Sequence, residues 1–236
     1  CTQTRLNSRR PLSGILGGGI DGEAANDNFG SAIATSSDGR RVVVGVRNHD
    51  STEEVTDSNG NSYFQNSVGS VRVLEYGASA DPTGWSQLGG DIDGTLNNCD
   101  DSCGGENFGA AVAMSADGNR IVVGAPYRYG AERVSDPCNS GSTYYQYGVG
   151  TVRVLEYGTT ANPSGWSQIG GDIDGEGVTT YGSEQFGSAV AMSSDGNRIV
   201  VGAPYHTSGT YNSCGNYNNL IWSIGTVRVF EYGTAA

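Results

Sequence analysis

Residues 186–204 read FGSAVAMSSDGNRIVVGAP, and their pattern predicts two β-strands joined by a turn. From Phe186 onward, larger side chains alternate with Gly and Ala, the period of two that is typical of a β-strand. The run Ile199-Val200-Val201 is apolar without alternation, as expected for a strand that is covered on both faces. Asp195-Gly196 stands between the two strands and predicts a tight hairpin in which both central residues have positive φ.

The same stretch occurs three times, beginning at Phe29, Phe108 and Phe186, which lie 79 and 78 residues apart. Each copy continues, after a long variable loop, into a Val-Arg-Val strand. A fourth element, beginning with Trp-Ser-Gln, spans residues 85–94 and 166–175, and a degenerate copy of its second half spans 16–22. Four strands in each copy predict one four-stranded antiparallel sheet per repeat, which is the pattern of a β-propeller.

The strings Phe-Gly, Asp-Gly, Val-Val-Gly-Ala-Pro and Gly-Thr-Val-Arg-Val resemble the FG-GAP repeat of integrin α-subunit propellers. The resemblance covers residues 12–233, and the first copy departs from it with Val46-Arg47 in place of Ala-Pro. It implies an all-β fold, a β-propeller-like array of three four-stranded antiparallel blades within one domain. The repeats are expected at roughly 12–78, 79–158 and 159–236.

We expect the core of this array to contain one phenylalanine and one valine from each repeat. These residues are Phe29, Phe108, Phe186, Val43, Val122 and Val200.

The composition excludes several classes of protein. Glycine accounts for 38 of the 236 residues and charged residues for only 16%, which disfavours a helical bundle. Acidic residues outnumber basic ones by 25 to 13, the opposite of the balance expected for a nucleic-acid binder. The apolar runs are too short for a transmembrane helix, so no membrane insertion is expected.

Five cysteines in a glycine-rich, acidic chain favour an oxidising, extracellular location. Cys99 and Cys103 are close enough in sequence to form a local disulfide, and Cys138 and Cys214 lie in corresponding loops of neighbouring repeats. Cys1 is left over and is either free or bonded to another chain. The alternative is a reduced cytosolic protein with inert thiols.

The FG-GAP pattern often includes a calcium loop between its first two strands. In this chain the loop is shortened, and Asp38, Asp117 and Asp195 each supply a single carboxylate, fewer than Ca²⁺ requires. We therefore expect no metal there and no cofactor. Other carboxylates gather near the glycine-rich bends, where turn chemistry is the main interpretation and a calcium site is the alternative. They are Asp21, Glu23, Asp27, Asp91, Asp93, Glu106, Asp172, Asp174, Glu176 and Glu184.

Catalytic motifs are missing from the sequence, and no catalytic residue is expected. His49 and His206 both stand four residues after a repeated glycine, where the second repeat has Arg128, so a structural role is favoured for this position. The chain contains no Gly-x-Ser-x-Gly elbow, His-Glu-x-x-His pair or phosphate-binding glycine loop. We therefore expect a protein that is not an enzyme.

The long loops 46–67, 125–148 and 203–223 are rich in Tyr, Asn, Ser and Gly, a composition typical of binding loops. Self-packing of these loops over the sheet edges is the alternative. The contact candidates are Tyr127, Tyr129, Tyr144, Tyr145, Tyr147, Tyr205, Tyr211, Tyr217 and Trp222.

Three repeats are fewer than the four to eight blades of a propeller. The chain is therefore a fragment of a larger propeller, an unusual closed unit, or a protomer whose open edges are covered by neighbours. The leading hypothesis is a secreted, non-catalytic structural or adhesion module whose partners are other copies of itself, or glycans. In this hypothesis the chain forms a fibre through residues 12–20 and the long loops. The second hypothesis is a ligand-binding, calcium-dependent domain of a larger cell-surface or secreted protein, and the third is a hydrolase or lyase.

Overall fold

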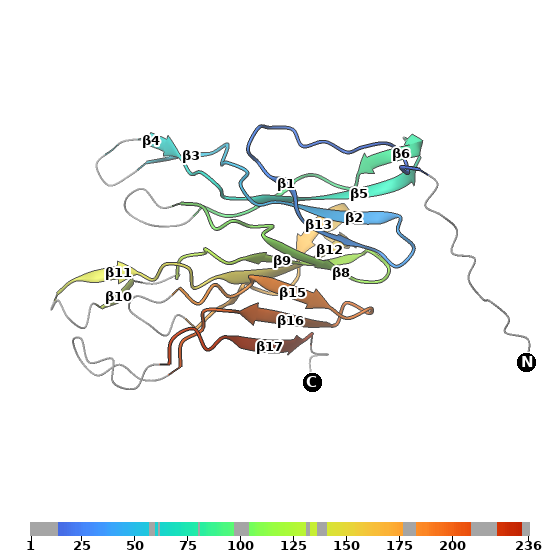
Figure 1. Ribbon diagram of the computed structural model, residues 1–236. Helices are drawn as coiled ribbons and strands as arrows, with labels where there is room; N and C mark the ends of the chain where they lie inside the picture. Colours follow the sequence, from blue (N-terminus) through green and yellow to red (C-terminus); the bar gives the residue numbers. More distant parts are fainter. Residues whose placement is uncertain are drawn as a thin grey trace, which may run out of the picture.

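The computed structural model describes residues 14–56, 60, 62–79, 81–96, 104–130, 133–135, 141–176, 183–208 and 221–232. This part of the chain is all-β, with antiparallel sheets and no helix (Figure 1). The strands are β1 (Phe29–Thr35), β2 (Arg41–Val46), β3 (Glu54–Thr56), β4 (Ser62–Phe64), β5 (Ser70–Ala78), β6 (Asp81–Gln87), β7 (Ile92–Asp93), β8 (Ala111–Met114), β9 (Arg120–Ala125), β10 (Arg133–Ser135), β11 (Thr143–Tyr145), β12 (Thr151–Thr159), β13 (Asn162–Gln168), β14 (Ile173–Asp174), β15 (Ala189–Met192), β16 (Arg198–Ala203) and β17 (Thr226–Glu231).

The three repeats form three separate sheets. The first sheet has the order β1-β2-β5-β6, and the short β7 also pairs with β5. The second sheet repeats this arrangement as β8-β9-β12-β13, with β14 pairing with β12. The third sheet consists of β15-β16-β17. Two small ribbons, β3-β4 and β10-β11, project from the long loops of the first two repeats.

The sheets lie one above another in an open stack, with β1 against β8 and β8 against β15 (Figure 1). This corrects the expected array of three four-stranded blades, because the described part of the third sheet has three strands and the stack does not close into a propeller. In the first two sheets the Trp-Ser-Gln element forms the outer strands β6 and β13, and the described residues contain no such strand beside β17.

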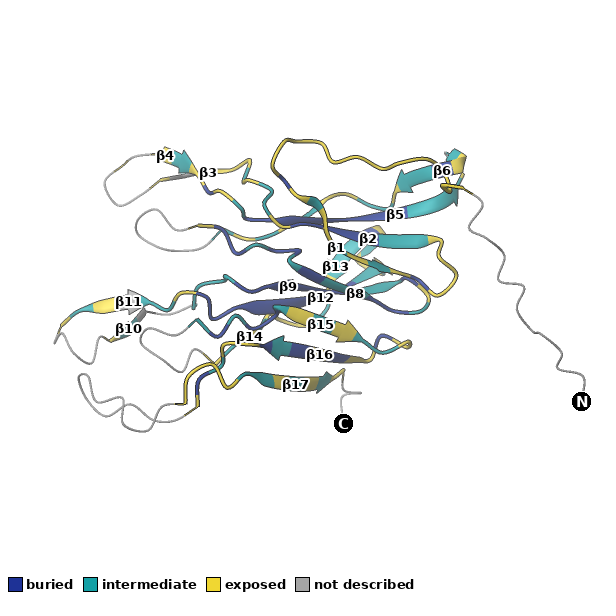
Figure 2. Cartoon of the chain, in the orientation of Figure 1, coloured by how far each residue is buried: buried dark blue, intermediate teal, exposed yellow. Residues whose placement is uncertain are grey.

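Two apolar cores hold the stack together. The core between the first and second sheets contains Val43 and Phe108, and the core between the second and third contains Val122 and Phe186, all four with 0% exposure. The prediction of burial is therefore confirmed at these four positions. Figure 2 shows the buried strands concentrated in the middle of the stack.

The prediction of burial is wrong at the two ends of the stack. Phe29 is only half-buried, and Val200 is 36% exposed. Their equivalents in the other repeats are covered by a neighbouring sheet. Among the described residues, no sheet precedes the first one or follows the third, so these two side chains remain in contact with solvent.

Close backbone approach between sheets depends on glycine. A Cβ atom added to Gly45 would overlap the carbonyl oxygen of Gly109, and one added to Gly124 would overlap that of Gly187. The second glycine of each pair belongs to the Phe-Gly string and has a φ of 88° or 90°, a conformation that L-residues rarely adopt. The Phe-Gly and Val-Val-Gly strings are thus the two sides of one inter-sheet contact.

The hairpin that joins β1 to β2 is wider than the sequence predicts. Ser36 N–H donates to the carbonyl of Arg41 at 2.9 Å, so residues 37–40 form a four-residue loop in which Gly39 alone has positive φ. The two-residue turn predicted at Asp38-Gly39 is therefore wrong. Because the Asp38 carboxylate accepts hydrogen bonds from Ser36 Oγ and the Arg40 N–H, the Asp backbone stays out of the left-handed region. The other two hairpins have the same hydrogen bonds.

Candidate functional site

The outer surface of the third sheet exposes apolar side chains that are buried in the other two sheets. We call this surface the tail face and define it as Val200, Ile224, Val227 and Val229. Val227 and Val229 are 67% and 65% exposed, whereas their equivalents in the second sheet, Val152 and Val154, are 0% and 2% exposed. The same face is buried in the first and second sheets and is in contact with water in the third.

The opposite end of the stack carries the degenerate copy of the fourth element. We call residues 14–22 the head segment. The carbonyl of Leu16 accepts a hydrogen bond from Trp85 Nε1 at 2.9 Å, as the carbonyl of Leu88 does from Trp166 Nε1 at 2.9 Å. The head segment therefore lies on the first sheet as the end of the first sheet lies on the second. Its apolar side chains Ile15, Leu16 and Ile20 are exposed.

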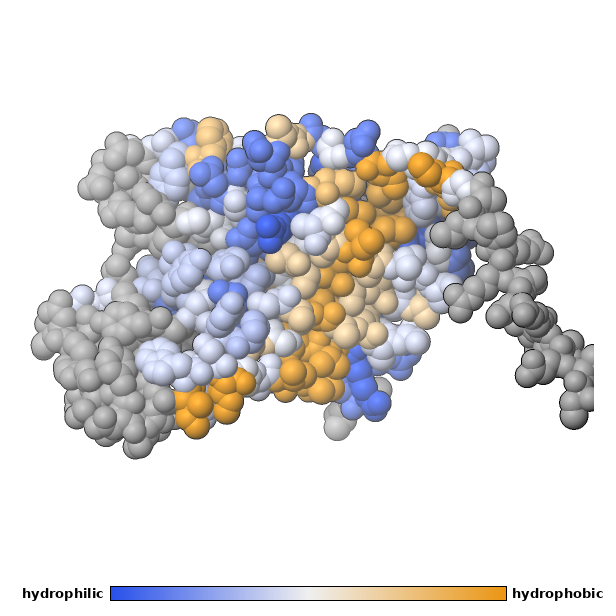
Figure 3. Space-filling model, viewed as in Figure 1, coloured by the Kyte–Doolittle hydropathy of each residue, from blue (hydrophilic) through white to orange (hydrophobic). Residues whose placement is uncertain are grey.

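A band of apolar surface also runs across one face of the molecule, over the region of β1, β8 and β15 (Figure 3). These strands pair on one side only within their sheets. Ile33 in β1 is 70% exposed, whereas its equivalents Val112 and Val190 are partly buried against the inter-sheet cores. The exposure of Ile33 again follows from the lack of a preceding sheet among the described residues.

Buried ion pairs stand at the same place in the second and third repeats. Glu106 has 0% exposure, and its carboxylate lies 2.8 Å from Arg128 Nη1 and 2.9 Å from Arg153 Nη2. Glu184 is equivalent and lies 2.6 Å from Arg228 Nη2. A buried carboxylate needs such partners, because an isolated charge away from water is strongly destabilised.

Glu106 and Glu184 are therefore buried, and the expectation that they lie in solvent is wrong. The expected turn chemistry is present, because each carboxylate also accepts a backbone N–H of the neighbouring bend, from Thr95 and from Glu176. A signal for them exists in the sequence: a carboxylate precedes each Phe-Gly string by two residues, and each Val-Arg-Val strand supplies an arginine. Neither feature alone indicates that the carboxylate and the arginine meet. Two further carboxylates of the group form similar pairs, since Asp91 lies 2.9 Å from Arg72 Nε and Asp172 lies 3.2 Å from Arg153 Nε.

His49 and His206 lie beside the carboxylates that precede the Phe-Gly strings. His49 Nδ1 lies 3.1 Å from Asp27, which is equivalent to Glu106, and His206 Nδ1 lies 3.6 Å from Glu184. Arg128 occupies the equivalent place in the second repeat. All three side chains therefore face the carboxylate that precedes the Phe-Gly string. This supports the structural role that the repeat pattern favoured.

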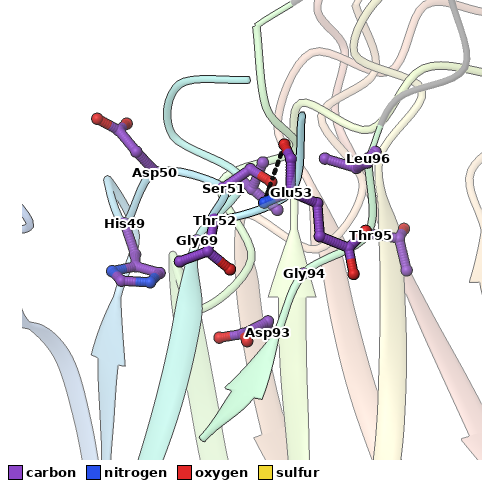
Figure 4. A pocket seen from close by; sticks show the side chains of 11 residues that line it. His49, Asp50, Ser51, Thr52, Glu53, Gly69, Asp93, Gly94, Thr95 and Leu96 are labelled. Atoms are coloured by element: carbon purple, nitrogen blue, oxygen red, sulfur yellow. Dashed lines mark hydrogen bonds between the residues drawn. The ribbon is translucent and has the colours of Figure 1, made fainter. Parts of the chain in front are cut away.

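A cleft of about 340 Å³ opens between the loop that follows β2 and the segment that follows β7 (Figure 4). Its lining includes His49, Asp50, Glu53 and Asp93, with hydroxyl groups from Ser51, Thr52 and Thr95. Ser51 Oγ donates to the Glu53 carbonyl at 3.0 Å and accepts from the Glu53 N–H at 2.9 Å, which fixes this corner of the loop. The cleft combines these acidic and hydroxyl groups with apolar side chains from Val68 and Leu96, and its size suits a small ligand.

The aromatic loop residues divide between self-packing and exposure. The ring of Tyr147 lies 6.0 Å from that of Tyr127 and 5.2 Å from that of Tyr129, between ring centres. Burial raises the pKa of both Tyr129 and Tyr147 above the ordinary value. Tyr147, Tyr205 and Trp222 nevertheless remain about half exposed. Tyr145 is half-buried at the end of β11.

Several predicted positions lie outside the described residues. They are Tyr211, Tyr217, the side chain of Tyr144, and all five cysteines, Cys1, Cys99, Cys103, Cys138 and Cys214. The two disulfide pairings therefore remain predictions.

In the shortened hairpins, each aspartate carboxylate accepts hydrogen bonds from other residues of the same hairpin. Burial acts to raise the pKa of Asp117, but hydrogen bonds from Ser115 Oγ at 2.6 Å and from the Asn119 N–H at 3.0 Å outweigh it, and the net pKa lies below the ordinary 3.8. Hydrogen bonds from Ser36 and Ser193 likewise lower the pKa values of Asp38 and Asp195. Within the described ranges, no group of three His, Cys, Asp or Glu side chains could hold a metal ion.

We expect Ser115→Ala to raise the pKa of Asp117, because the charged form loses its shortest hydrogen bond. A carboxylate with a lowered folded-state pKa stabilises the fold above its unfolded pKa, and this contribution disappears as the pH falls through the folded-state value. The variant should therefore lose less stability than the parent between neutral pH and pH values below 3.8. Carbon-13 NMR titration of the aspartate carboxyl groups measures the shift. Asp195 is the internal control, and an unchanged Asp117 titration would contradict the assignment.

The described residues contain no helix that is long and apolar enough to cross a membrane. No family model matches this chain, and no curated protein matches it.

Proposed function

We propose that this protein is a secreted, non-catalytic structural module that assembles with other copies of itself into a fibre or matrix. The observation that supports this most directly is the tail face, where Val227 and Val229 are exposed at positions that are buried in both other sheets. Apolar surface of this kind on a sheet commonly marks an interaction site. A second copy offers a fitting partner, because its head segment already lies on the first sheet as part of a missing preceding sheet would.

We further propose that the repeats are FG-GAP-like blades of a propeller-related array. Three features support the proposal: the conserved order of Phe-Gly, Asp-Gly and Val-Val-Gly within the chain, the repeated strand order of the first two sheets, and the contact between the Phe-Gly and Val-Val-Gly glycines. An array of this kind that does not close leaves two unlike ends. Repetition of a contact between unlike ends gives a ring if the rotation closes and a helical filament if it does not.

We expect the purified chain to form ordered polymers as its concentration rises. Each added copy covers one tail face and removes apolar area from water, and this favours association. Sedimentation velocity and negative-stain electron microscopy measure the result. A monodisperse monomer at concentrations well above micromolar would contradict the proposal.

Val229→Asp tests whether the tail face makes this contact. Because Val229 is already 65% exposed in the single chain, the substitution should leave its thermal unfolding almost unchanged. A buried aspartate at a junction between copies would lack a partner, so assembly should be lost.

A second candidate function is ligand binding in the acidic cleft beside His49. The supporting observation is a cavity of about 340 Å³ lined by carboxylates and hydroxyl groups, which suits a polar ligand such as a saccharide. A glycan array probed with Val229→Asp, the variant expected to stay monomeric, tests this function separately from assembly. Binding that is lost on Asp93→Asn would support it, and an array without any signal would remove it.

A further inference from the structure

The two junctions inside the stack use the same backbone contacts. Gly69 forms a parallel bridge with Phe108, and Gly150 forms the same bridge with Phe186. In each case the phenylalanine N–H donates to the carbonyl of the residue before the glycine, at 3.0 Å for Val68 and 3.2 Å for Val149. The structure thus contains two copies of one junction.

The third sheet carries the glycines that accept the Phe-Gly string at the internal junctions, and no described residue of another repeat lies against them. Gly202 is equivalent to Gly124, but a Cβ atom added to Gly202 would meet only Ala189, at 3.5 Å from its Cβ. Gly225 is equivalent to Gly150, and its nearest neighbours are backbone atoms of its own repeat. Ile224 is 55% exposed, whereas the equivalent Val149 is 5% exposed.

The first sheet carries the other side of this junction, a Phe-Gly string. Phe29 and Gly30 are equivalent to Phe186 and Gly187, and Gly30 has the same positive φ, 87°. Phe29 is half-buried, and an atom added to Gly30 would meet nothing within 4 Å. The Phe-Gly string is therefore shaped for a junction that the described residues of one chain do not supply.

The head segment completes the match. In the first and second sheets, the end of the fourth element pairs with the start of the Val-Arg-Val strand, as Ile92 with Val71 and Ile173 with Val152. Ile20 is the equivalent isoleucine, is 37% exposed, and belongs to no described strand. Val227 is the equivalent valine in β17 and pairs on one side only, with Gly202 of β16.

We propose that the third sheet of one copy receives the head segment of the next copy as a donated strand. This inference rests on the proposed function and specifies its contact. Ile20 pairs antiparallel with Val227, and Asp21 pairs with Thr226. Phe29-Gly30 of the same incoming copy fills the position over Gly202 and Gly225. The partner is thus a second copy of this chain, bound head to tail in the register of the internal junctions.

The junction between copies differs from the internal ones in two charges. Gly19 stands where Asp91 and Asp172 pair with the Val-Arg-Val arginine, so the donated strand brings no such carboxylate. Arg40 is equivalent to Asn119, which accepts a hydrogen bond from Arg41 of the preceding sheet. At the junction between copies, Arg40 would therefore lie beside Arg198, the equivalent of Arg41 in the receiving copy. Arg198 is exposed and bonded to Glu231. Two nearby arginines repel, and this repulsion is screened by salt, so salt should favour assembly.

Gly202→Ala tests the contact with one methyl group. In the single chain the added Cβ atom has room, but at the proposed junction it would overlap the carbonyl of Gly30, as a Cβ on Gly124 would overlap Gly187. The concentration required for assembly should rise about tenfold or more, while thermal unfolding of the dilute chain stays unchanged. Gly90→Ala is the matched control, because its Cβ would meet nothing within 4 Å.

Disulfide trapping tests the register. A chain carrying Ile20→Cys is mixed with a chain carrying Val227→Cys, so that a bond between the two positions is intermolecular, and the linked peptides are identified by mass spectrometry. Thr83→Cys, exposed on β6, replaces Ile20→Cys in the control mixture.

The outcomes separate the two proposals. A bond between positions 20 and 227, with assembly lost in Gly202→Ala, supports strand donation. Polymers that form without this bond and tolerate Gly202→Ala would overturn strand donation and leave self-assembly standing. A parent chain that stays monomeric would overturn both.

Discussion

Replacing Phe186 with alanine is expected to lower the free energy of unfolding by about 3–5 kcal/mol. Phe186 has 0% exposure and fills the core between the second and third sheets. Its ring packs edge to face against Phe230, with centroids 6.1 Å apart, and Arg228 lies over its face at 5.0 Å. The substitution removes this apolar area and leaves a cavity that rigid sheets fill only in part.

Phe29→Ala is the matched control, because Phe29 occupies the same place in the first repeat but is only half-buried. The loss of stability should be less than half of that for Phe186→Ala, since it scales with the apolar area removed from water. Chemical denaturation measures both values, below the concentration at which the chain assembles, because association adds to apparent stability. Equal losses in the two variants would contradict the end-of-stack position of Phe29.

Gly124→Ala is the second large effect, with an expected loss of about 3 kcal/mol. The added Cβ atom would overlap the backbone carbonyl of Gly187, and a backbone atom held in a sheet cannot rotate away as a flexible side chain can. The second and third sheets would have to separate locally. This would weaken the core that contains Phe186.

Gly202→Ala shows the difference that a neighbouring sheet makes. Gly202 occupies the same place in its sheet as Gly124, yet the nearest atom to an added Cβ is 3.5 Å away. Thermal unfolding of dilute protein should therefore change by less than about 0.5 kcal/mol for this variant. An equally small loss of stability in Gly124→Ala and Gly202→Ala would contradict the close contact between Gly124 and Gly187.

Part of the candidate site could be predicted from the sequence. The repeated strings show which glycines and phenylalanines are equivalent, and residues 16–22 repeat the end of the fourth element without a Val-Arg-Val strand before them. The exposure of Val200, Val227 and Val229 could not be predicted, because their strings have the same apolar pattern as their buried equivalents. Local pattern determines which face of a strand is apolar. It does not determine whether a neighbour covers that face.

The buried ion pairs show a similar limit. Glu106 lies in a glycine-rich bend, where a carboxylate usually remains in water and supports a turn. Its burial with Arg153 depends on two segments that are 47 residues apart and meet only when the second sheet packs under the first. Residue type and spacing alone therefore gave no measure of its exposure.

The antiparallel pairing of the strands in each repeat followed from the sequence alone, because alternation of large and small side chains and the position of Asp-Gly act over a few residues. The number of strands in each sheet did not follow, since the described part of the third sheet has three strands and not four. The tertiary structure decided how the repeats relate to one another. Only it shows that the sheets form an open stack, that Phe29 and Val200 lie at its two ends, and that Gly202 has room for a side chain. This is because burial and close backbone approach are properties of pairs of sheets, and repeats of similar sequence differ in both when one has a single neighbour and the other has two.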